Sequence, residues 1–400
     1  MLAKLELQQD LNTRTNKALK PKLKIMENTT LFENLTTRDF LSNISEIPRP
    51  STTEILLRFE PYSVYIDRIV SPIWYIIGLF GNPISAKVWL GRKSRKNSSA
   101  IYLGLLAIVH MFQLIIHFVF VELTYTWDIP TNNKPVLCET LNVLSIIPQY
   151  LAPLLVLGFT VERYIAVCHP FKKETFCTVR RAIIVIACLA ALSVGFACVQ
   201  ADLWTYYPIY KDCFSKNENQ KFQTIWTAIT EIMFFLVVPL CVLMFNILVI
   251  REIKRITSHG PAVTAGGSQT STVTLLSVSF YFICTLLPAS VVYAIQNEMP
   301  NGKMENLQSL ERIESDPVWL SFFTYIAIRK VVEEICLSNS ACYFFIYYIT
   351  GKYYRQQVNS FLRIDKCCRK FSDKDSTLSS EKTKYSLVST NGNGMHATQI

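Results

Sequence analysis

Seven blocks of mostly apolar residues run through the chain, each about 20–25 residues long. A helix of this length crosses the hydrocarbon core of a bilayer, and only helices or closed barrels satisfy their backbone in lipid. With 50% hydrophobic and 18% charged residues, the chain is also too apolar for an ordinary soluble domain. We therefore expect an all-α membrane protein, a seven-transmembrane helix bundle over 69–90, 98–122, 139–162, 181–203, 224–250, 272–296 and 318–349.

Basic residues predict how this bundle is oriented, because cytoplasmic loops carry an excess of Lys and Arg. They gather in alternate connections and in the tail: Arg92, Lys93, Arg95, Lys96, Lys172, Lys173, Arg180, Arg181, Arg251, Lys254, Arg255, Lys352, Arg355, Arg363, Lys366, Arg369 and Lys370. This places the N-terminus outside and the C-terminus in the cytoplasm of a multi-pass plasma-membrane protein. The net charge of +10 is then explained by membrane topology, and nothing points to nucleic acid.

The segment before the first block, 1–68, is polar and carries three acceptor sites for N-glycosylation, Asn28, Asn34 and Asn43. We expect it to be extracellular, glycosylated and mostly disordered. Residues 1–30 contain no apolar stretch that reads as a signal peptide, so the first transmembrane helix is expected to direct insertion, and Met26 is an alternative start. The transmembrane domain is expected over 69–350.

The chain after the seventh block divides into two parts. Residues 351–370 hold a short amphipathic stretch, predicted as an eighth helix, followed by Cys367 and Cys368 beside basic residues, a pattern typical of S-palmitoylation. Residues 371–400 are polar and rich in serine and threonine, which favours a disordered cytoplasmic tail. Its hydroxyls are candidates for a receptor kinase, and phosphorylation would suit arrestin; a merely solvating tail is the alternative.

An acid and an arginine stand side by side at the end of the third block, in Glu162-Arg163-Tyr164. Charged residues at such a site are costly unless they are functional. Together with the seven blocks, this placement resembles the Asp/Glu-Arg-Tyr motif of rhodopsin-like G-protein-coupled receptors. The resemblance implies a heterotrimeric G protein as partner, with Arg163 meeting it. It also implies a disulfide between Cys138, at the outer end of the third helix, and Cys213 in the second extracellular loop.

Further residues that match the family are distributed over several helices. Asn82 follows Gly81 as in the family's first helix, Pro239 takes the bulge position of the fifth, and Phe282 and Pro288 resemble the switch region of the sixth. In the seventh block, Asn339-Ser340-Ala341-Cys342-Tyr343 resembles the Asn-Pro-x-x-Tyr motif with serine in place of proline. The Asn-Ser form of this motif, together with the runs TVERYIAVCHPF and CTVRRA, resembles the sequences of invertebrate neuropeptide receptors, especially FMRFamide-type ones.

The chain departs from the family at several of its switch positions. His110 replaces the aspartate that binds sodium, and a histidine is a poor ligand for such a hard cation, so we expect no metal here. A neutral His110 is instead expected to hydrogen-bond to Asn339, the alternative being a histidine that gains charge with pH. Leu286 stands where a tryptophan is usual, and Glu162 is left as the restraint on Arg163. High basal activity is therefore a hypothesis, and poor coupling is its opposite.

Ionisable residues in the outer halves of the helices are the candidates for ligand binding, since such residues within a membrane are usually functional. Glu231 and Glu122 come first as carboxylates for an arginine near the end of a short amidated peptide, and Glu333 comes third. Arg329 and Glu333 are four residues apart, so this pair also has a purely structural interpretation. Four aromatic residues are candidates for stacking on the ligand: Tyr150, Trp204, Tyr206 and Tyr207.

Three functions remain open at this point. The first is a receptor for an extracellular peptide, and the second is a divergent chemoreceptor of the same fold for a small molecule. The third, a small proton-linked transporter, lacks the internal repeats that transporters usually show. No enzyme motif such as a phosphate loop, a zinc-protease helix or a nucleophile elbow is present, and no cofactor is expected.

Overall fold

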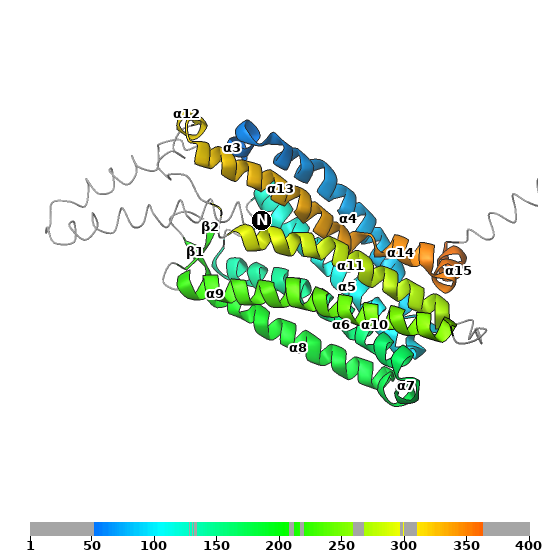
Figure 1. Cartoon of the computed structure of the whole chain (residues 1–400). Helices are drawn as coiled ribbons and strands as arrows, with labels where there is room; N and C mark the ends of the chain where they lie inside the picture. The colour runs from blue at the N-terminus through cyan, green and yellow to red at the C-terminus, as the bar shows by residue number, and fades with distance from the viewer. Residues whose placement is uncertain are drawn as a thin grey trace, which may run out of the picture.

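A computed structural model of the chain describes residues 52–127, 129, 131, 134–207, 212–216, 220–258, 268–296, 299 and 310–362. The expected glycosylation sites Asn28, Asn34 and Asn43 and the expected palmitoylation sites Cys367 and Cys368 lie outside these residues. The long helices run side by side, with α3, α12 and the hairpin β1–β2 at one end and α7 and α15 at the other (Figure 1). The elements are α3 (Thr52–Phe59), α4 (Pro61–Trp89), η1 (Ser94–Lys96), α5 (Ser98–His117), η2 (Phe118–Thr126), α6 (Pro135–Cys168), α7 (Pro170–Phe176), α8 (Val179–Leu203), β1 (Trp204–Tyr207), β2 (Asp212–Ser215), α9 (Gln220–Glu231), η4 (Ile232–Val237), α10 (Val238–Ser258), α11 (Ser268–Gln296), α12 (Leu310–Glu314), α13 (Pro317–Ala341), α14 (Tyr343–Thr350) and α15 (Lys352–Phe361).

The seven-helix bundle expected from the apolar blocks is confirmed. Within the described residues, six helical spans are long and apolar enough to cross a membrane, built from α4, α5 with η2, α6, α8, α9 with η4 and α10, and α11. The seventh crossing is α13 with α14, and its middle carries charged residues. The expected eighth helix is α15, which follows α14 after Gly351.

The helices extend beyond the apolar blocks, most of all at the start of the first one. Helix α4 begins at Pro61 rather than at residue 69, and α3 precedes it, so residues 52–59 and 61–68 are helical although the sequence favoured disorder there. Proline at the first position of α4 suits a helix start, because that position has no intrahelical partner for an N–H. The polar residue Asp67 is retained in this extension because it is paired inside the bundle.

Side-chain caps mark where three of the helices begin. Asn97 accepts a hydrogen bond from the backbone of Ser99 at 3.2 Å before α5, and Thr178 accepts one from Arg181 at 3.4 Å before α8. Asp316 accepts one from Val318 at 3.0 Å before α13, where Pro317 again takes the first position. Such caps satisfy N–H groups that have no partner within the helix.

A two-stranded hairpin, β1 paired antiparallel with β2, covers one end of the bundle. Tyr206 of β1 lies opposite Cys213 of β2, and Cys213 forms a disulfide with Cys138 of α6, with the two Cα atoms 5.5 Å apart. The predicted Cys138–Cys213 bond is thereby confirmed. It ties the connection between α8 and α9 to the N-terminal end of α6.

Aromatic and aliphatic side chains fill the opposite half of the bundle. Tyr102, Phe159, Phe282, Tyr343 and Tyr347 belong to one continuous core that joins α5, α6, α11 and α14. On the outside of the bundle, large apolar side chains are exposed, as helices that face lipid require. They include Ile69, Ile73, Ile76, Phe80, Ile183, Ile184, Val185, Leu192, Phe280 and Val291.

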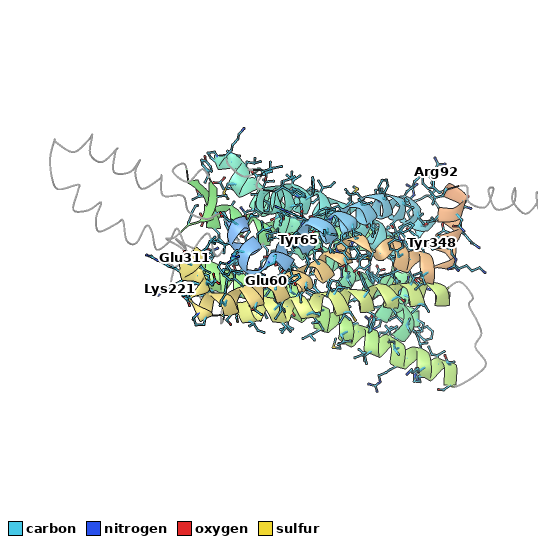
Figure 2. The ribbon with its side chains drawn as sticks, turned by 90° about the horizontal axis from the view of Figure 1, so that it is seen from above. Glu60, Tyr65, Arg92, Lys221, Glu311 and Tyr348 are labelled. Carbon is cyan, nitrogen blue, oxygen red and sulfur yellow. A yellow bond between two sulfur atoms is a disulfide. The ribbon has the colours of Figure 1, made fainter. Side chains whose placement is uncertain are left out.

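The two ends of the molecule differ in charge. Figure 2 shows Arg92 at one end, beside Tyr348, and Glu311 and Lys221 at the other. The end with Arg92 also holds the basic residues of η1, α7, the start of α8, the end of α10 and α15.

Candidate functional site

A pocket of about 220 Å³ opens among α5, α6, α9, α11 and α13, on the side of the disulfide. Glu231, Arg329 and Glu333, three of the predicted ligand-binding residues, line this pocket together. Phe282 and Leu286 of α11 also line it, so two of the predicted switch residues contribute to the same cavity. The structure thus brings candidates from helices far apart in the sequence to one place.

Arg329 and Glu333 form an ion pair within α13. Nε of Arg329 lies 2.9 Å from Oε1 of Glu333, and Arg329 is only 2% exposed. The guanidinium also lies over the ring of Tyr293, 5.0 Å from its centre, and Tyr293 donates to Glu333 at 3.4 Å. Lys330 Nζ lies 3.1 Å from the other oxygen of Glu333. Glu333 is therefore surrounded by donors of its own chain.

Asp67 completes this network and is a residue that the sequence interpretation missed. Its Oδ1 lies 3.0 Å from Nζ of Lys330, which joins α4 to α13. It was overlooked because the apolar pattern places the start of the first helix after it. The available signal was Pro61, which suits the first position of a helix, followed within two turns by the charged pair Asp67-Arg68.

Glu122, predicted as a first candidate for the ligand, takes a different position. It is 2% exposed in η2 and accepts hydrogen bonds from Trp127 at 3.1 Å and from Tyr75 at 3.3 Å. In the part of the chain that the structure describes, Glu122 is not among the residues that line the pocket. Its position is explained by packing between α4 and η2.

The aromatic residues predicted to stack on the ligand do not all line the pocket. Tyr150 and Trp204 line the pocket, and Tyr150 stacks on Phe234 with ring centres 4.1 Å apart. Tyr206 packs with the hydrophobic cluster around the disulfide. The side chain of Tyr207 lies outside the described residues.

Where the pocket reaches the middle of the bundle, polar side chains join its helices. Asn82 donates to the carbonyl of Ser340 at 2.8 Å, and Asn339 donates to Thr285 at 2.5 Å. The expected bond between His110 and Asn339 is not formed, since Asn339 is directed at α11. His110 is instead packed against Tyr343, with ring centres 4.9 Å apart. The reason is that helix α11 offers a hydroxyl within reach of Asn339.

The backbone departs from regular α-helix at two of the predicted switch positions. The π-helix η4 ends at Val237, just before Pro239, and such bulges are frequent at functional sites. Between α13 and α14 the helix is interrupted at Cys342, although the proline expected by family resemblance is Ser340. Pro288 lies inside α11, where it removes a backbone hydrogen bond.

At the other end of α6, Glu162 is buried with 8% exposure and is held by the start of α5. Its Oε2 accepts hydrogen bonds from Ser98 at 2.7 Å and from Ser99 at 3.3 Å. The thiol of Cys177 donates to the backbone carbonyl of Glu162 at 3.5 Å, and burial raises the pKa of this thiol, which keeps it a neutral donor. Tyr164 packs against Phe245 of α10.

The sequence of this bundle matches the family described as "7 transmembrane receptor (rhodopsin family)" over residues 81–330. The match covers more than half of the chain and includes Glu162-Arg163-Tyr164 and the residues of the pocket up to Lys330. The chain belongs to the rhodopsin family of seven-transmembrane receptors. It is accordingly a receptor rather than an enzyme.

Individual relatives are similar to this receptor at low identity. The mouse protein "G-protein coupled receptor 35" is 24% identical over 282 residues, which cover 70% of this chain and 84% of the relative. The Caenorhabditis elegans "Neuromedin U receptor homolog nmur-2" is 27% identical over 160 residues, 39% of each chain. The Drosophila melanogaster "Pyrokinin-1 receptor" is 30% identical over 144 residues, 36% of this chain and 33% of the relative.

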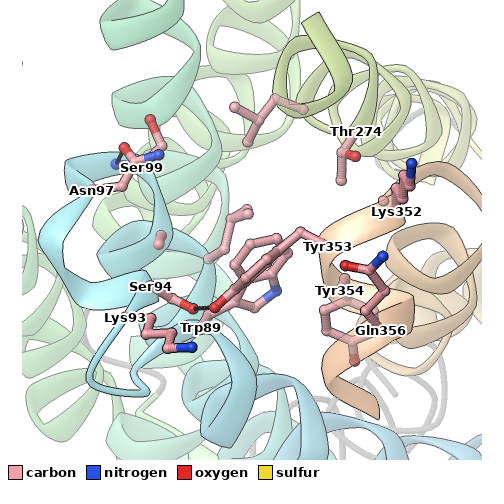
Figure 3. Close-up of a pocket in the computed structure, with 14 residues that line it drawn as sticks. Trp89, Lys93, Ser94, Asn97, Ser99, Thr274, Lys352, Tyr353, Tyr354 and Gln356 are labelled. Carbon is pink, nitrogen blue, oxygen red and sulfur yellow. Dashed lines mark hydrogen bonds between the residues drawn. The ribbon is translucent and has the colours of Figure 1, made fainter. Parts of the chain in front are cut away.

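A second cavity, of about 410 Å³, lies at the basic end of the receptor. Figure 3 shows its walls: Lys93, Ser94 and Asn97 from the connection between α4 and α5, Thr274 from α11, and Lys352 and Gln356 from α15. Ser94 and Tyr353 are hydrogen-bonded at 3.0 Å across it. Ser99, which holds Glu162, also lines this cavity, so the Glu-Arg-Tyr segment and α15 share one face of the receptor.

Proposed function

We propose that this receptor binds a short amidated neuropeptide from outside the cell and activates a heterotrimeric G protein inside. The observation that carries the proposal is the pocket in which Glu231, Arg329 and Glu333 meet aromatic side chains from α6, η4, α11 and β1. Charged and aromatic groups around one cavity suit a peptide with basic and aromatic residues. The similarity to the neuromedin U and pyrokinin receptors supports a neuropeptide ligand.

The route to the G protein follows the packed interior. Leu286 and Phe282 line the pocket, and Phe282 belongs to the same core as Tyr343 and Tyr347. A ligand that prefers one arrangement of α11 shifts the equilibrium between two states of the bundle. Outward movement of α11 would then open the cytoplasmic face at Arg163 for the G protein. Asn82, Asn339, Pro239 and Pro288 are the further residues that we assign to this switch.

The orientation and the modifications belong to the same proposal. The end with Arg92, α7 and α15 carries most of the basic residues and is assigned to the cytoplasm. The N-terminus, with acceptor sites at Asn28, Asn34 and Asn43, then lies outside the plasma membrane. Palmitoylation at Cys367 and Cys368 would hold the end of α15 at the bilayer, and a receptor kinase and arrestin would act on the tail after residue 370.

The experiment is G-protein activation in cells that express the full chain, measured with and without a panel of amidated peptides. Arg163→Ala serves as the control that is expressed at the surface but does not couple. A dose-dependent signal that is lost in Arg163→Ala supports the proposal. A large signal without peptide, also lost in the control, identifies high basal activity. Silence of the whole panel at confirmed surface expression contradicts the peptide proposal.

One observation favours the second candidate, a chemoreceptor for a small molecule. The pocket volume of about 220 Å³ is below the range of about 300–1,000 Å³ typical of sites for drug-sized ligands. A small ligand fits this closed form directly, whereas a peptide requires the outer ends of the helices to open. Activation by small acids or amines, with no response to peptides, would establish this candidate.

A further inference from the structure

Glu334 is a buried carboxylate of the pocket whose surroundings differ from those of its neighbour Glu333. It is 7% exposed, and its Oε1 accepts a hydrogen bond from Ser71 at 2.6 Å. Its Oε2 is buried and has no hydrogen-bond partner among the described residues. Within the same residues, no Lys or Arg nitrogen is placed within 4 Å of it, whereas Glu333 has two such contacts. In direct contact, Glu334 therefore has only one neutral hydroxyl among the described residues, and Lys330 attracts its charge from beyond 4 Å.

Two other polar side-chain atoms of the pocket also have no hydrogen-bond partner within the described residues. Oε1 of Gln113 and Nδ1 of His110 are buried without a hydrogen-bond partner in the described part of the chain. His110 and Gln113 stand one turn apart on α5, which packs against α13. Both side chains line the pocket, as Glu334 does. Buried polar atoms without partners are rare, so three around one cavity point to a missing donor.

The nearest cations of the receptor are already engaged elsewhere. Lys330 is held between Asp67 at 3.0 Å and Glu333 at 3.1 Å, and Arg329 is held by Glu333 at 2.9 Å. Moving either of them to Glu334 would break a pair that is itself buried. The missing donor is therefore expected to come from outside the chain.

We propose that Glu334, Gln113 and His110 form a subsite for a guanidinium group of the ligand. A guanidinium presents five N–H donors in one plane, which suits a carboxylate on α13 together with an amide oxygen and a neutral imidazole nitrogen on α5. A charge-assisted bond to Glu334 also brings a cation into direct contact with this carboxylate. The proposal rests on the peptide function and deepens it, because it assigns the ligand's arginine to Glu334 rather than to Glu231, Glu122 or Glu333.

The first test uses small probes and the purified full-length receptor, so that it does not depend on knowing the peptide. Thermal unfolding is followed with increasing butylguanidinium, butylammonium and uncharged butylurea. Butylguanidinium is expected to raise the unfolding temperature at lower concentration than butylammonium, and butylurea is expected to have no effect. In Glu334→Gln the concentration of butylguanidinium for half of the shift should rise about tenfold or more, since a hydrogen bond to a charged group is lost.

The substitution is chosen so that folding is preserved. Glutamine at position 334 keeps an oxygen for the hydroxyl of Ser71, removes the charge and replaces the second oxygen by a neutral NH2 group of similar size. Glu122→Gln is the matched control, because Glu122 is equally buried but lies outside the pocket. It should leave the butylguanidinium shift unchanged. Equal shifts by all three probes, no shift by any probe, or the same shift in Glu334→Gln as in the wild type would overturn the proposal. The last result would mean that Glu334 simply carries a proton.

The second test depends on the proposed peptide function. Phe-Met-Arg-Phe-amide is compared with the same peptide that has citrulline, a neutral isostere of arginine, in the G-protein assay. In the wild type the citrulline peptide should be at least about tenfold weaker, and in Glu334→Gln the two should be nearly equal. If every peptide of the panel is inactive in every variant, the peptide function is contradicted, while the probe experiment still decides the subsite. An undiminished preference for arginine in Glu334→Gln overturns the subsite alone.

Discussion

Glu162 and Glu333 are two carboxylates of the same bundle, one at the basic end of α6 and one in the middle of the seventh crossing, and they are held in different ways. Glu162, next to Arg163, accepts hydrogen bonds from the neutral hydroxyls of Ser98 and Ser99. Glu333 lies between Arg329 and Lys330 and also accepts from Tyr293. Glu162 thus has two neutral donors in direct contact and attracts the neighbouring cation Arg163, whereas Glu333 is in direct contact with two cations. The difference suggests that the Glu162 region is the one able to rearrange, and that the Glu333 region fixes α13 in place.

The largest effect, and the most direct test of this difference between the two regions, is expected from Glu333→Ala. It removes the carboxylate shared by two largely buried cations, and breaking a buried pair costs about 3–5 kcal/mol of stability. We expect a large fall in the unfolding temperature and in surface expression, measured on the purified receptor and by cell-surface labelling. Glu333→Gln, which keeps hydrogen-bond acceptance, should lose less. If Glu162→Ala proves as harmful as Glu333→Ala, the two regions are equally rigid and the comparison is wrong.

The disulfide provides the second largest effect expected. Replacing Cys138 and Cys213 together by alanine frees a loop with a sequence separation of 75 residues. Loss of a native disulfide typically costs about 2–5 kcal/mol. We expect lower thermal stability and a loss of peptide response, since β1 and β2 are no longer tied to α6. Arg163→Ala, which reaches the surface but does not couple, gives the level of a lost response in this assay. A peptide response as large as that of the wild type would show that the hairpin stays in place without the disulfide.

A smaller effect is expected when the hydroxyls around Glu162 are removed. In the double variant Ser98→Ala with Ser99→Ala, the buried carboxylate of Glu162 loses the two hydroxyl groups that donate hydrogen bonds to it, which costs about 1–3 kcal/mol of stability. We further expect a lower signal without ligand, because the carboxylate then turns to the neighbouring Arg163. The measurements are thermal unfolding and basal G-protein activation at matched surface expression. A higher basal signal would instead mean that the two serines hold the resting state.

The smallest effect should come from Asn97→Ala at the start of α5. The helix loses its side-chain cap to the backbone of Ser99, worth about 1 kcal/mol. Because α5 also carries Ser98, this change tests how firmly the Glu162 region depends on the helix start. Asn97→Ser retains a cap and should restore stability in the same unfolding experiment. Equal stability of wild type, Asn97→Ala and Asn97→Ser would show that the cap is unimportant here.

Sequence patterns predicted the scaffold more completely than the site. The apolar blocks, the Cys138–Cys213 bond and the bulge near Pro239 depend on local patterns or on matches to the family, and each is present in the structure. The contacts of His110 and Glu122 were not predictable in this way. His110 packs on Tyr343, and Glu122 is taken by Tyr75 and Trp127, because neighbours from other helices reach them first.

The amino-acid sequence by itself determined that the chain crosses the membrane seven times and belongs to the rhodopsin family of receptors, since hydrophobic length and short motifs are properties of single segments. The pair of Arg329 with Glu333 follows from their spacing of four residues within α13. Only the tertiary structure decided which charges meet between helices. Asp67 pairs with Lys330 across 263 positions of sequence, and Glu334 retains an oxygen without a partner in the described residues. The physical reason is that ion pairs and hydrogen bonds act over about 3 Å, so those between helices depend on how seven helices pack and not on any one of them.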